Sequence, residues 1–318
     1  MSPALSLAMP VRNGERFIEA AVGSLLAQSF TDYELLIVDN ASTDATQQIC
    51  ERLTRSDPRI RYFRNKADIG AGANFNRGVE LASGVLFKWC AHDDLISPDY
   101  LARCIAALAA RPSAVTAYGR LLGIDESGAL TGYIEDPLPA VENIAAARRF
   151  DMVTRRQGLD AAIFGLHRRS ALLATSLHLP YYGSDCALLS ELALLGPFVH
   201  VPEAVLFSRE HPTRSVNLTC ADRLAWQAAA GAKPNAREFS SRIRHLYAIA
   251  FRHRATAPFT ATAVALTIWL MHPVRLGRVA LEAVGSVSPS LRAKLRAAGL
   301  AILSRFGGRS ARRGRQDA

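Results

Sequence analysis

The alternation of short apolar runs with helix-like segments over the first 118 residues constrains the fold more than any other feature. We interpret five runs as strands: Ala4–Met9, Leu35–Val38, Ile60–Phe63, Val85–Ala91 and Ala114–Tyr118. The segments between them carry apolar residues at helical spacing and predict helices over Glu15–Ala27, Thr43–Thr54, Gly70–Leu81 and Pro98–Ala110. This rhythm predicts an α/β fold with a mostly parallel sheet and helices on both faces.

The rest of the chain follows the pattern less closely. We interpret Gly119–Arg156 as a variable insertion over the sheet, Ala161–Leu166 as another buried strand and Gly183–Leu195 as a helix. From about Asn217 the composition becomes rich in Ala and Arg, which favours helices.

Positive charge is concentrated in the last third of the chain. Residues 220–318 hold 17 Lys and Arg against 4 Asp and Glu, whereas residues 1–219 hold 21 against 24. Apolar and cationic residues alternate at helical spacing in 242–254 and again in 291–306. Two interpretations have equal weight: a helix on an anionic membrane surface, or a helical appendage whose basic face is solvated.

The chain shows no cysteine framework and no secretory leader. Its five cysteines are scattered without a C-x-x-C spacing, as expected for thiols in a reducing cytosol. The first residues lack a basic segment followed by a long apolar run. The longest apolar run, Phe259–Met271, has 13 residues, and a spanning helix needs about 20. We therefore expect a buried or interfacial helix there.

Acidic residues follow two of the predicted strands directly. Ligands of open α/β sheets bind outside the carboxyl ends of the strands, which is where Asp39 and the pair Asp93-Asp94 fall. The pair could hold a divalent cation together with phosphate oxygens, or it could cap the next helix, and we weigh these equally. We expect Ser42 or Thr43 to cap the second helix, which leaves Asp39 free for a base or ribose.

Several motifs in order resemble those of family 2 glycosyltransferases. They are Met9–Gly14, Leu25–Phe30, Glu34–Asp44, Asn65–Gly78, Gly84 and His92-Asp93-Asp94. The similarity is strong over about residues 4–120 and looser to about residue 217. It implies a GT-A fold and an inverting enzyme that moves a sugar from a nucleotide-diphosphate sugar to a hydroxyl acceptor.

The resemblance also implies roles for individual residues in the first half. The nucleotide would be contacted by Pro10, Val11, Arg12 and Asp39, with Asp93 on ribose or phosphate and Asp94 on Mg²⁺ or Mn²⁺. His92 departs from the pattern because the family often has Asp there, so the preferred cation is open. Asn74 and Arg77, after a glycine-containing turn, are further candidates for the nucleotide or diphosphate.

The second half supplies the candidates for proton transfer and diphosphate binding. Inversion needs a carboxylate that takes the acceptor proton, and Asp185 matches the family's position for it. Asp at a helix start is also favoured by the helix dipole alone. Arg209 and His211 lie in a segment that resembles the family's R-x-H-x-x-S. We expect Arg209 or Arg214 on the diphosphate and His211 on the metal, although such clusters are often solvated loops.

These inferences divide the chain into parts with different tasks. Residues 1–217 would form the catalytic domain, with 1–120 binding the donor and 121–217 the acceptor, followed by a basic helical appendage over 218–306 and a disordered tail over 307–318. We expect a cytoplasmic hexosyltransferase of cell-surface or exopolysaccharide synthesis. It would act on a glycan or lipid-linked acceptor, touch the inner face of the membrane peripherally and bind no nucleic acid.

The alternatives are proteins without catalysis: a module that only binds a nucleotide sugar, or one that binds a membrane surface. A dehydrogenase is disfavoured because the chain lacks G-x-G-x-x-G.

Overall fold

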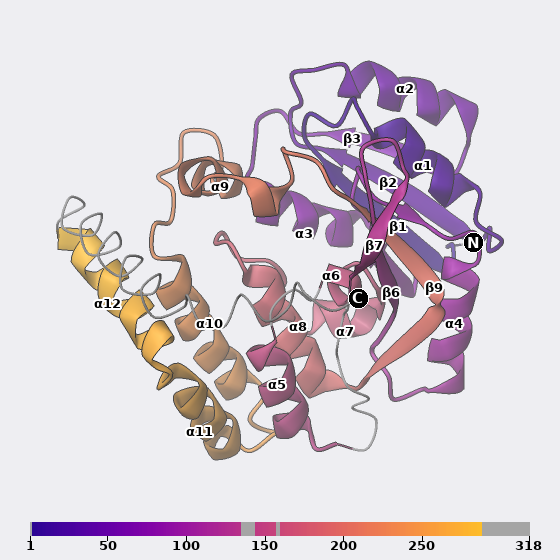
Figure 1. Ribbon diagram of the computed structural model, residues 1–318. Helices are drawn as coiled ribbons and strands as arrows, with labels where there is room; N and C mark the ends of the chain where they lie inside the picture. Colours follow the sequence, from indigo (N-terminus) through magenta and orange to yellow (C-terminus); the bar gives the residue numbers. More distant parts are fainter. Residues whose placement is uncertain (1, 135–143, 157–159, 288–318) are drawn as a thin grey trace, which may run out of the picture.

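The computed structural model describes residues 2–134, 144–156 and 160–287, which form a mixed nine-stranded sheet between two layers of helices (Figure 1). The strands are β1 Leu5–Val11, β2 Tyr33–Asp39, β3 Ile60–Arg64, β4 Leu86–Trp89, β5 Leu95–Ile96, β6 Thr116–Ile124, β7 Leu130–Ile134, β8 Leu166–Arg168 and β9 Phe198–Arg209. The first helices are α1 Ile18–Leu26, α2 Thr46–Ser56, α3 Ala71–Leu81, α4 Tyr100–Ala110, α5 Ala146–Arg155 and α6 Asp160–Ile163. The later ones are α7 Arg169–Leu173, α8 Ser184–Leu195, α9 Cys220–Gln227, α10 Glu238–Arg252, α11 Phe259–Leu270 and α12 Pro273–Val287, with a 3₁₀ turn at Ser215–Asn217.

The strand order is β3-β2-β1-β4-β8-β6-β9-β5, with β7 paired to β6 at one side. The predicted α/β class and the helix-covered sheet are confirmed. The prediction of a mostly parallel sheet holds only for β3, β2, β1 and β4. Beyond β4 the directions are mixed: β8 runs antiparallel to both β4 and β6, β7 to β6 and β5 to β9, while β6 and β9 are parallel. Helical crossover connections give parallel pairing in the first half and again between β6 and β9.

The parallel strands read as continuous apolar runs because both of their faces are covered. Every residue of β1 and β2 is buried. Helices α1, α2 and α4 lie on one face of the sheet, and α3, α7 and α8 lie on the other (Figure 1). Gly78 lets α3 approach β1 closely, since a Cβ at this glycine would come within 2.7 Å of the Ala8 Cβ.

Two sequence-based assignments are wrong. Ala161–Leu166, expected to be a strand, is mostly the short helix α6, and β8 begins only at Leu166. A short apolar run does not distinguish a buried helix from a buried strand, which explains the error. Within Gly119–Arg156, expected to be irregular, β6 continues to Ile124 and pairs with β7, and α5 follows. The part of that segment at 135–143 lies outside the described residues.

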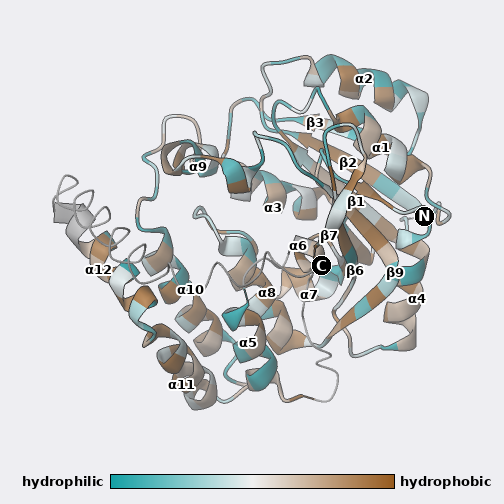
Figure 2. Cartoon of the chain, in the orientation of Figure 1, coloured by the Kyte–Doolittle hydropathy of each residue, from teal (hydrophilic) through white to brown (hydrophobic). Residues whose placement is uncertain are grey.

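A second hydrophobic cluster joins the helices after residue 217 to the sheet domain. Side chains of α10 and α11 pack against α5 and α8, with Phe150, Ala187, Leu194, Leu246 and Trp269 among the buried members. Figure 2 shows hydrophobic residues along the central strands and again along α11. The C-terminal helices are therefore packed onto the domain. The expected disordered tail, 307–318, and residues 288–306 lie outside the described part.

A helix needs about 20 mostly apolar residues to cross a bilayer. Among the described helices, none reaches that threshold alone. Phe259–Leu270 and Pro273–Ala283 meet it jointly, by length and composition, but they are bent by 83° relative to each other.

Candidate active site

The candidate site begins where three neighbouring parallel strands end. Strand β1 lies between β2 and β4, and Val11 is in register with Asp39. The segments that leave these strands, which include Arg12, Asn40 and the Asp93-Asp94 pair, therefore emerge at one edge of the sheet. This is the edge at which open α/β sheets bind ligands.

Asp39 is buried and fully hydrogen-bonded. One carboxylate oxygen accepts bonds from the Ser42 backbone N–H at 2.8 Å and its hydroxyl at 2.6 Å. The other accepts bonds from the Tyr62 hydroxyl at 2.6 Å and Arg64 Nη1 at 2.9 Å, and the side chain has no exposed surface. Both oxygens of Asp39 therefore have partners within the protein, and its contact with a nucleotide stays a prediction. Desolvation of this carboxylate is offset by donors of the protein itself.

The expected capping of α2 is also wrong. Ser42 donates to Asp39, and Thr43 bonds to Asn13 Oδ1 through its backbone N–H at 2.9 Å. The helix begins at Thr46, whose N–H and hydroxyl both bond to Asp44. The loop from 40 to 45 is thereby tied to the end of β1.

A network of amides and charges connects Arg12 to the turn that precedes α3. Arg12 forms an ion pair with Asp68, and Asp68 also accepts a 2.6 Å bond from Asn40 Nδ2. Asn65 donates to both Asn40 and Asn74, at 3.0 and 2.9 Å. Arg12 remains half-exposed, with 39% of its side-chain surface accessible. The Arg12 guanidinium is thus held at the edge of the sheet where the parallel strands end, and it is open to solvent.

Asn74 is buried, and its Nδ2 donates to the Val38 carbonyl at 2.8 Å. This bond holds α3 against β2, and the predicted contact of Asn74 with the nucleotide sugar stays a prediction. Arg77 lies half-buried on α3. Pro10 and Val11 are buried in β1, so a ligand at this edge meets the chain from Arg12 onward.

The Asp93 carboxylate pairs with a histidine from the other half of the chain. Its Oδ2 lies 2.9 Å from His211 Nε2, and His211 Nδ1 lies 2.9 Å from the Thr213 hydroxyl. Burial alone raises the pKa of Asp93, but the charges of His92 and His211 and the bond to His211 lower it to about 2. Asp93 is therefore an anion, whereas His211 already has a partner at both ring nitrogens. A role of His211 as a metal ligand stays a prediction.

Arg209 holds the turn that contains Asp93 and Asp94, which we call the acidic turn, in place. The exposed fraction of this residue is 3%, and its side chain donates to the carbonyls of Asp93, Asp125 and Glu126, each at 2.9 Å. Its backbone N–H donates to Asp94 Oδ1 at 2.9 Å. The guanidinium therefore bonds to three backbone carbonyls of the protein, and a contact between Arg209 and a diphosphate stays a prediction.

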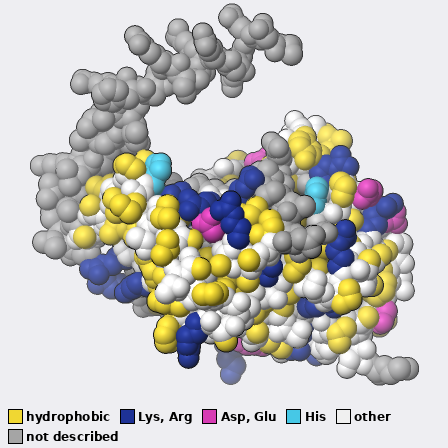
Figure 3. Space-filling view, turned by 90° about the horizontal axis from the view of Figure 1, so that it is seen from below, with side chains coloured by type: hydrophobic (Ala, Val, Ile, Leu, Met, Phe, Trp, Pro, Cys, Tyr) yellow, Lys and Arg dark blue, Asp and Glu magenta, His cyan; other side chains and the backbone are white. Residues whose placement is uncertain are grey.

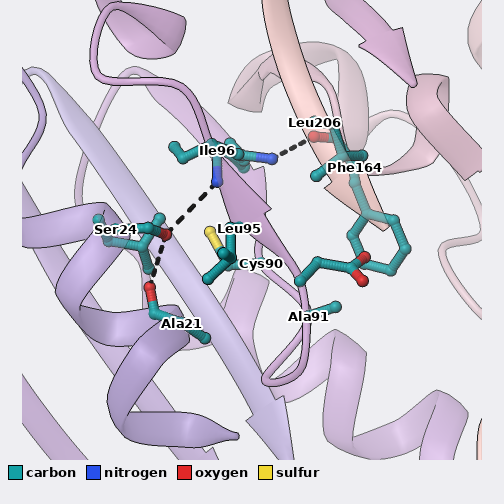
Figure 4. Close-up of a pocket in the computed structure, with 11 residues that line it drawn as sticks. Ala21, Ser24, Cys90, Ala91, Leu95, Ile96, Phe164 and Leu206 are labelled. Atoms are coloured by element: carbon teal, nitrogen blue, oxygen red, sulfur yellow. Dashed lines mark hydrogen bonds between the residues drawn. The ribbon is translucent and has the colours of Figure 1, made fainter. Parts of the chain in front are cut away.

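Beneath the Asp94 turn lies a cavity of about 10 Å³, too small for a nucleotide (Figure 4). Ser24 in its wall accepts a 3.4 Å bond from the Ile96 backbone N–H and donates to the Ala21 carbonyl at 2.8 Å. Lys88 also lines it, is fully buried, and donates to the Phe164 carbonyl. Burial lowers the pKa of Lys88. These contacts place β5, and hence Asp94, against α1.

The acidic side chains at this edge suit a divalent cation whose coordination shell is completed by a substrate. In the described ranges no three His, Cys, Asp or Glu side chains gather as a metal site. Mg²⁺ and Mn²⁺ commonly use one or two protein carboxylates together with substrate phosphates. Asp94, half-buried at the strand-end edge, fits that requirement. A cage formed by the protein alone does not exist in this part of the chain.

Asp185, the predicted base, comes from the second half of the chain. It lies in the first turn of α8, after Gly183, whose φ of 89° suits glycine. The hydroxyl of Ser184 is 3.3 Å from His178 Nδ1, and the His178 ring lies 5.2 Å from the ring of Trp89, the last residue of β4. The start of α8 is thereby attached to the strand that precedes Asp93 and Asp94.

Sequence reasoning did not find His178, Asp68, Tyr62 or Arg64. Asp68 and Gly70 form a recognisable turn before a helix, and this signal could have marked Asp68. Nothing in the neighbouring sequence marks His178, because most of its contacts come from residues about 100 positions away. Two hydrogen bonds join its backbone to the Asn76 side chain, for example.

This sheet, with its acidic strand end, is that of a GT-A glycosyltransferase, and comparison with known proteins agrees. The sequence model of Glycosyl transferase family 2 matches residues 6–172, more than half of the chain. The chain belongs to this family.

Curated relatives match part of their length. An uncharacterized glycosyltransferase of Haemophilus influenzae is 25% identical, with 66% of each chain covered. One from Rickettsia felis is 32% identical over 42% of this chain and 22% of its own length, and chondroitin synthase of Escherichia coli is 31% identical over 48% and 23%. The chain thus spans about a quarter or less of the latter two.

Solved structures share the fold. S. aureus TarS 1–349 in complex with UDP-GlcNAc has a TM-score of 0.60 at 16% identity, covering 85% of this chain and 72% of that one. The mannosyltransferase PcManGT from Pyrobaculum calidifontis, in complex with GDP-Man and Mn²⁺, has a TM-score of 0.53 at 16% identity, covering 95% and 81%.

Proposed function

We propose that this glycosyltransferase transfers a hexosyl group, with inversion, from a nucleotide-diphosphate sugar to a hydroxyl acceptor. The observation that carries the proposal is the attachment of the first turn of α8 to the end of β4 through His178 and Trp89. This attachment supports a position of Asp185 on the acceptor side of a diphosphate held at Asp93 and Asp94, which is where a general base is needed.

In this reaction the acceptor oxygen attacks the anomeric carbon as the bond from that carbon to the diphosphate oxygen breaks. Asp185 takes the acceptor proton, and the nucleoside diphosphate leaves with the bonding electrons. Arg12, fixed by Asp68, is placed to contact the nucleotide. Asp94 would hold Mg²⁺ or Mn²⁺, which neutralises diphosphate charge when bound. The Mn²⁺ complex of PcManGT supports this choice of cofactor.

The acceptor and location are also part of the proposal. We propose a glycan or lipid-linked saccharide acceptor in polysaccharide synthesis, used at the cytoplasmic face of a membrane that the C-terminal helices touch. The similarity to a chondroitin synthase supports a polysaccharide product. The basic residues after Cys220 support an anionic surface as partner.

The experiment combines donor binding with turnover. Wild type is screened by thermal shift with UDP-, GDP- and dTDP-sugars, with and without Mn²⁺, and one donor is expected to raise Tm. Asp185→Asn should keep that shift but lose at least about 100-fold in turnover, the usual contribution of a general base. Glu203→Gln, an exposed acid on β9, serves as the control.

If Asp185→Asn turns over donor at the wild-type rate, Asp185 is not the base. If wild type binds a donor but transfers no sugar to water or to any acceptor, the chain is the non-catalytic nucleotide-sugar-binding module of the alternative hypothesis.

A further inference from the structure

Four arginines surround a cavity of about 150 Å³ between α5 and the C-terminal helices. They come from α5, α10 and α12, and the walls between them are apolar or neutral. The lining consists of Thr154, Arg155, Phe239, Arg242, Trp269, His272, Val274, Arg275 and Arg278. This cavity, which we call the arginine pocket, belongs to none of the strand ends described above.

The positive charge of the arginine pocket is only partly balanced by the protein. Arg155 is paired with Asp151 at 2.6 Å, but no carboxylate of the described residues pairs with Arg242, Arg275 or Arg278. The Nε of Arg242 is buried without a hydrogen-bond partner. Burial, followed by the charges of Arg155 and Arg242, lowers the pKa of Arg275. Like charges crowded in this way favour an anion between them.

The guanidinium groups are held by the pocket walls. Arg275 lies 4.5 Å from the ring centre of Trp269 and donates to the Trp269 carbonyl at 2.6 Å. Arg242 lies 5.7 Å from the same ring, and Arg278 lies 5.0 Å from the ring of Phe239. Stacking on aromatic rings fixes the positions of these cations, so less side-chain entropy is lost when an anion binds.

The acids nearest the pocket are already used elsewhere. Glu282 accepts bonds from the backbone N–H groups of Phe239 and Ser240, each at 2.8 Å, at the start of α10. Asp151 is shared between Arg148 and Arg155. Neither carboxylate is hydrogen-bonded to the three arginines from α10 and α12.

An exposed apolar surface adjoins the arginine pocket. Helix α11 is apolar all around but buries only Thr262, Leu266 and Trp269. The outward-facing residues Val264, Ile268, Met271 and Val274 are between 55% and 67% exposed. Figure 3, seen from below, shows hydrophobic side chains side by side with a group of Lys and Arg side chains on this part of the molecule. We call these four residues the α11 apolar face; Val264 and Ile268 lie on α11, Met271 follows it, and Val274 lies at the start of α12.

We propose that the arginine pocket binds the phosphate of an acidic phospholipid while the α11 apolar face enters the boundary of the acyl chains. A water-exposed apolar surface next to unpaired cations is complementary to an anionic membrane surface, where phosphate lies directly above hydrocarbon. The inference rests on the membrane contact proposed above, names its site and its lipid class, and does not depend on the sugar-transfer chemistry.

The test is cosedimentation of the full chain with vesicles of phosphatidylcholine alone or with phosphatidylglycerol. Wild type should bind only the anionic vesicles. The variant with Arg242→Gln, Arg275→Gln and Arg278→Gln should lose at least about tenfold in affinity, since each basic residue near an anionic surface contributes substantially. The matched control, Arg52→Gln with Arg55→Gln and Arg103→Gln, removes the same charge from exposed positions on α2 and α4 and should lose clearly less.

A second variant tests the apolar contact without disturbing the pocket. Val264→Ser with Ile268→Ser changes two exposed residues, so the fold should be kept, and vesicle binding should fall while phosphate binding by calorimetry is unchanged. Circular dichroism confirms folding of each variant.

Equal losses of vesicle affinity in the two triple variants would mean that any removal of positive charge weakens binding, and would overturn the assignment of the arginine pocket as the lipid site. Binding of inorganic phosphate without binding of vesicles would make it a soluble-anion site and overturn the lipid assignment. Absence of vesicle binding by wild type would sink the membrane contact as well, while donor binding and turnover, measured separately, would still decide the proposed sugar transfer.

Discussion

Asp39 and Asp93 are both acids at strand ends, yet their surroundings give them different tasks. Asp39 has no exposed surface, and all its bonds are to the protein, including the ion pair with Arg64. Asp93 keeps 16% of its side-chain surface exposed and a single histidine partner. Asp39 therefore acts by positioning Tyr62, Arg64 and the Ser42 loop, whereas Asp93 has surface left for a ligand.

Asp39→Asn should destabilise the fold. The substitution removes the negative charge beside Arg64 and places an amide N–H₂ opposite donors, so we expect a loss of roughly 3–5 kcal/mol in the free energy of unfolding. Glu19→Gln, which breaks the exposed pair with Arg52, should cost at most about 1 kcal/mol. Urea denaturation measures both. Similar losses for the two variants would show that the Asp39 network is not tightly coupled to folding.

Buried histidines make stability depend on pH. His167 and His178 are fully buried, and this burial lowers the pKa of each from 6.5 to about 4. Their contribution to stability is complete above pH 6.5. It is lost as pH falls toward 4, because the unfolded chain takes up protons that the folded chain does not.

The free energy of unfolding should fall with pH by up to about 1.4 kcal/mol per pH unit for each of these histidines, between pH 6.5 and 4. Urea titrations at pH 7.5, 6.5, 5.5 and 4.8 give the slope. His167→Gln, which keeps a hydrogen-bonding side chain, should reduce the slope by about half. A flat profile over this range would contradict the assigned protonation states.

At the scale of secondary structure, the sequence predicts the first half of the sheet well. Strands β1 and β2 are buried on both faces and therefore appear as largely apolar runs, and the helices of this half have one apolar side. In contrast, β9 has alternating buried and exposed residues and ends in the polar segment around Arg209, so it was not anticipated. The candidate site was predictable to the same extent. The ends of the first strands can be located from the sequence, but the pairing of Asp93 with His211 is seen only in the tertiary structure.

The junction between α8 and α10 depends on one buried acid. Glu191 has no exposed surface and accepts bonds from Ser176, from Arg252 Nη1 at 2.9 Å and from His253 Nε2 at 2.8 Å. Its role is therefore structural. It links the helix that carries Asp185 to the first long C-terminal helix.

Glu191→Gln should weaken this junction by roughly 3 kcal/mol, because it leaves buried or half-buried cations without their counter-charge. The loss would appear in urea denaturation, and amide exchange in α10 should rise before exchange in β1. Glu203→Gln should change stability by less than about 0.5 kcal/mol. Unchanged exchange in α10 would mean that apolar contacts alone hold the helices together.

At the scale of the whole molecule, the C-terminal helices are not a detachable addition. Phe150, Ala187 and Leu194 from the first 217 residues are buried in the same cluster as α10 and α11. The segment after α9 also contacts the turn that precedes α3, because the Ala230 N–H donates to the Asp68 carbonyl at 2.8 Å. The turn that holds Arg12 is thereby coupled to residues beyond the sheet domain.

A chain that ends at residue 217 should therefore be unstable, although the sequence suggested a boundary there. Exposing Phe150 and Leu194 alone should cost roughly 3–6 kcal/mol, and Tm should fall by about 10 °C or more. A chain that ends at residue 287 keeps every described member of the cluster and should lose much less in Tm. Thermal unfolding followed by circular dichroism compares the two, and binding of a hydrophobic dye reports the exposed cluster. If the chain ending at 217 melts cooperatively at the wild-type temperature, the helices after it do not stabilise the catalytic domain, and their retention would have to be explained by the surface they present.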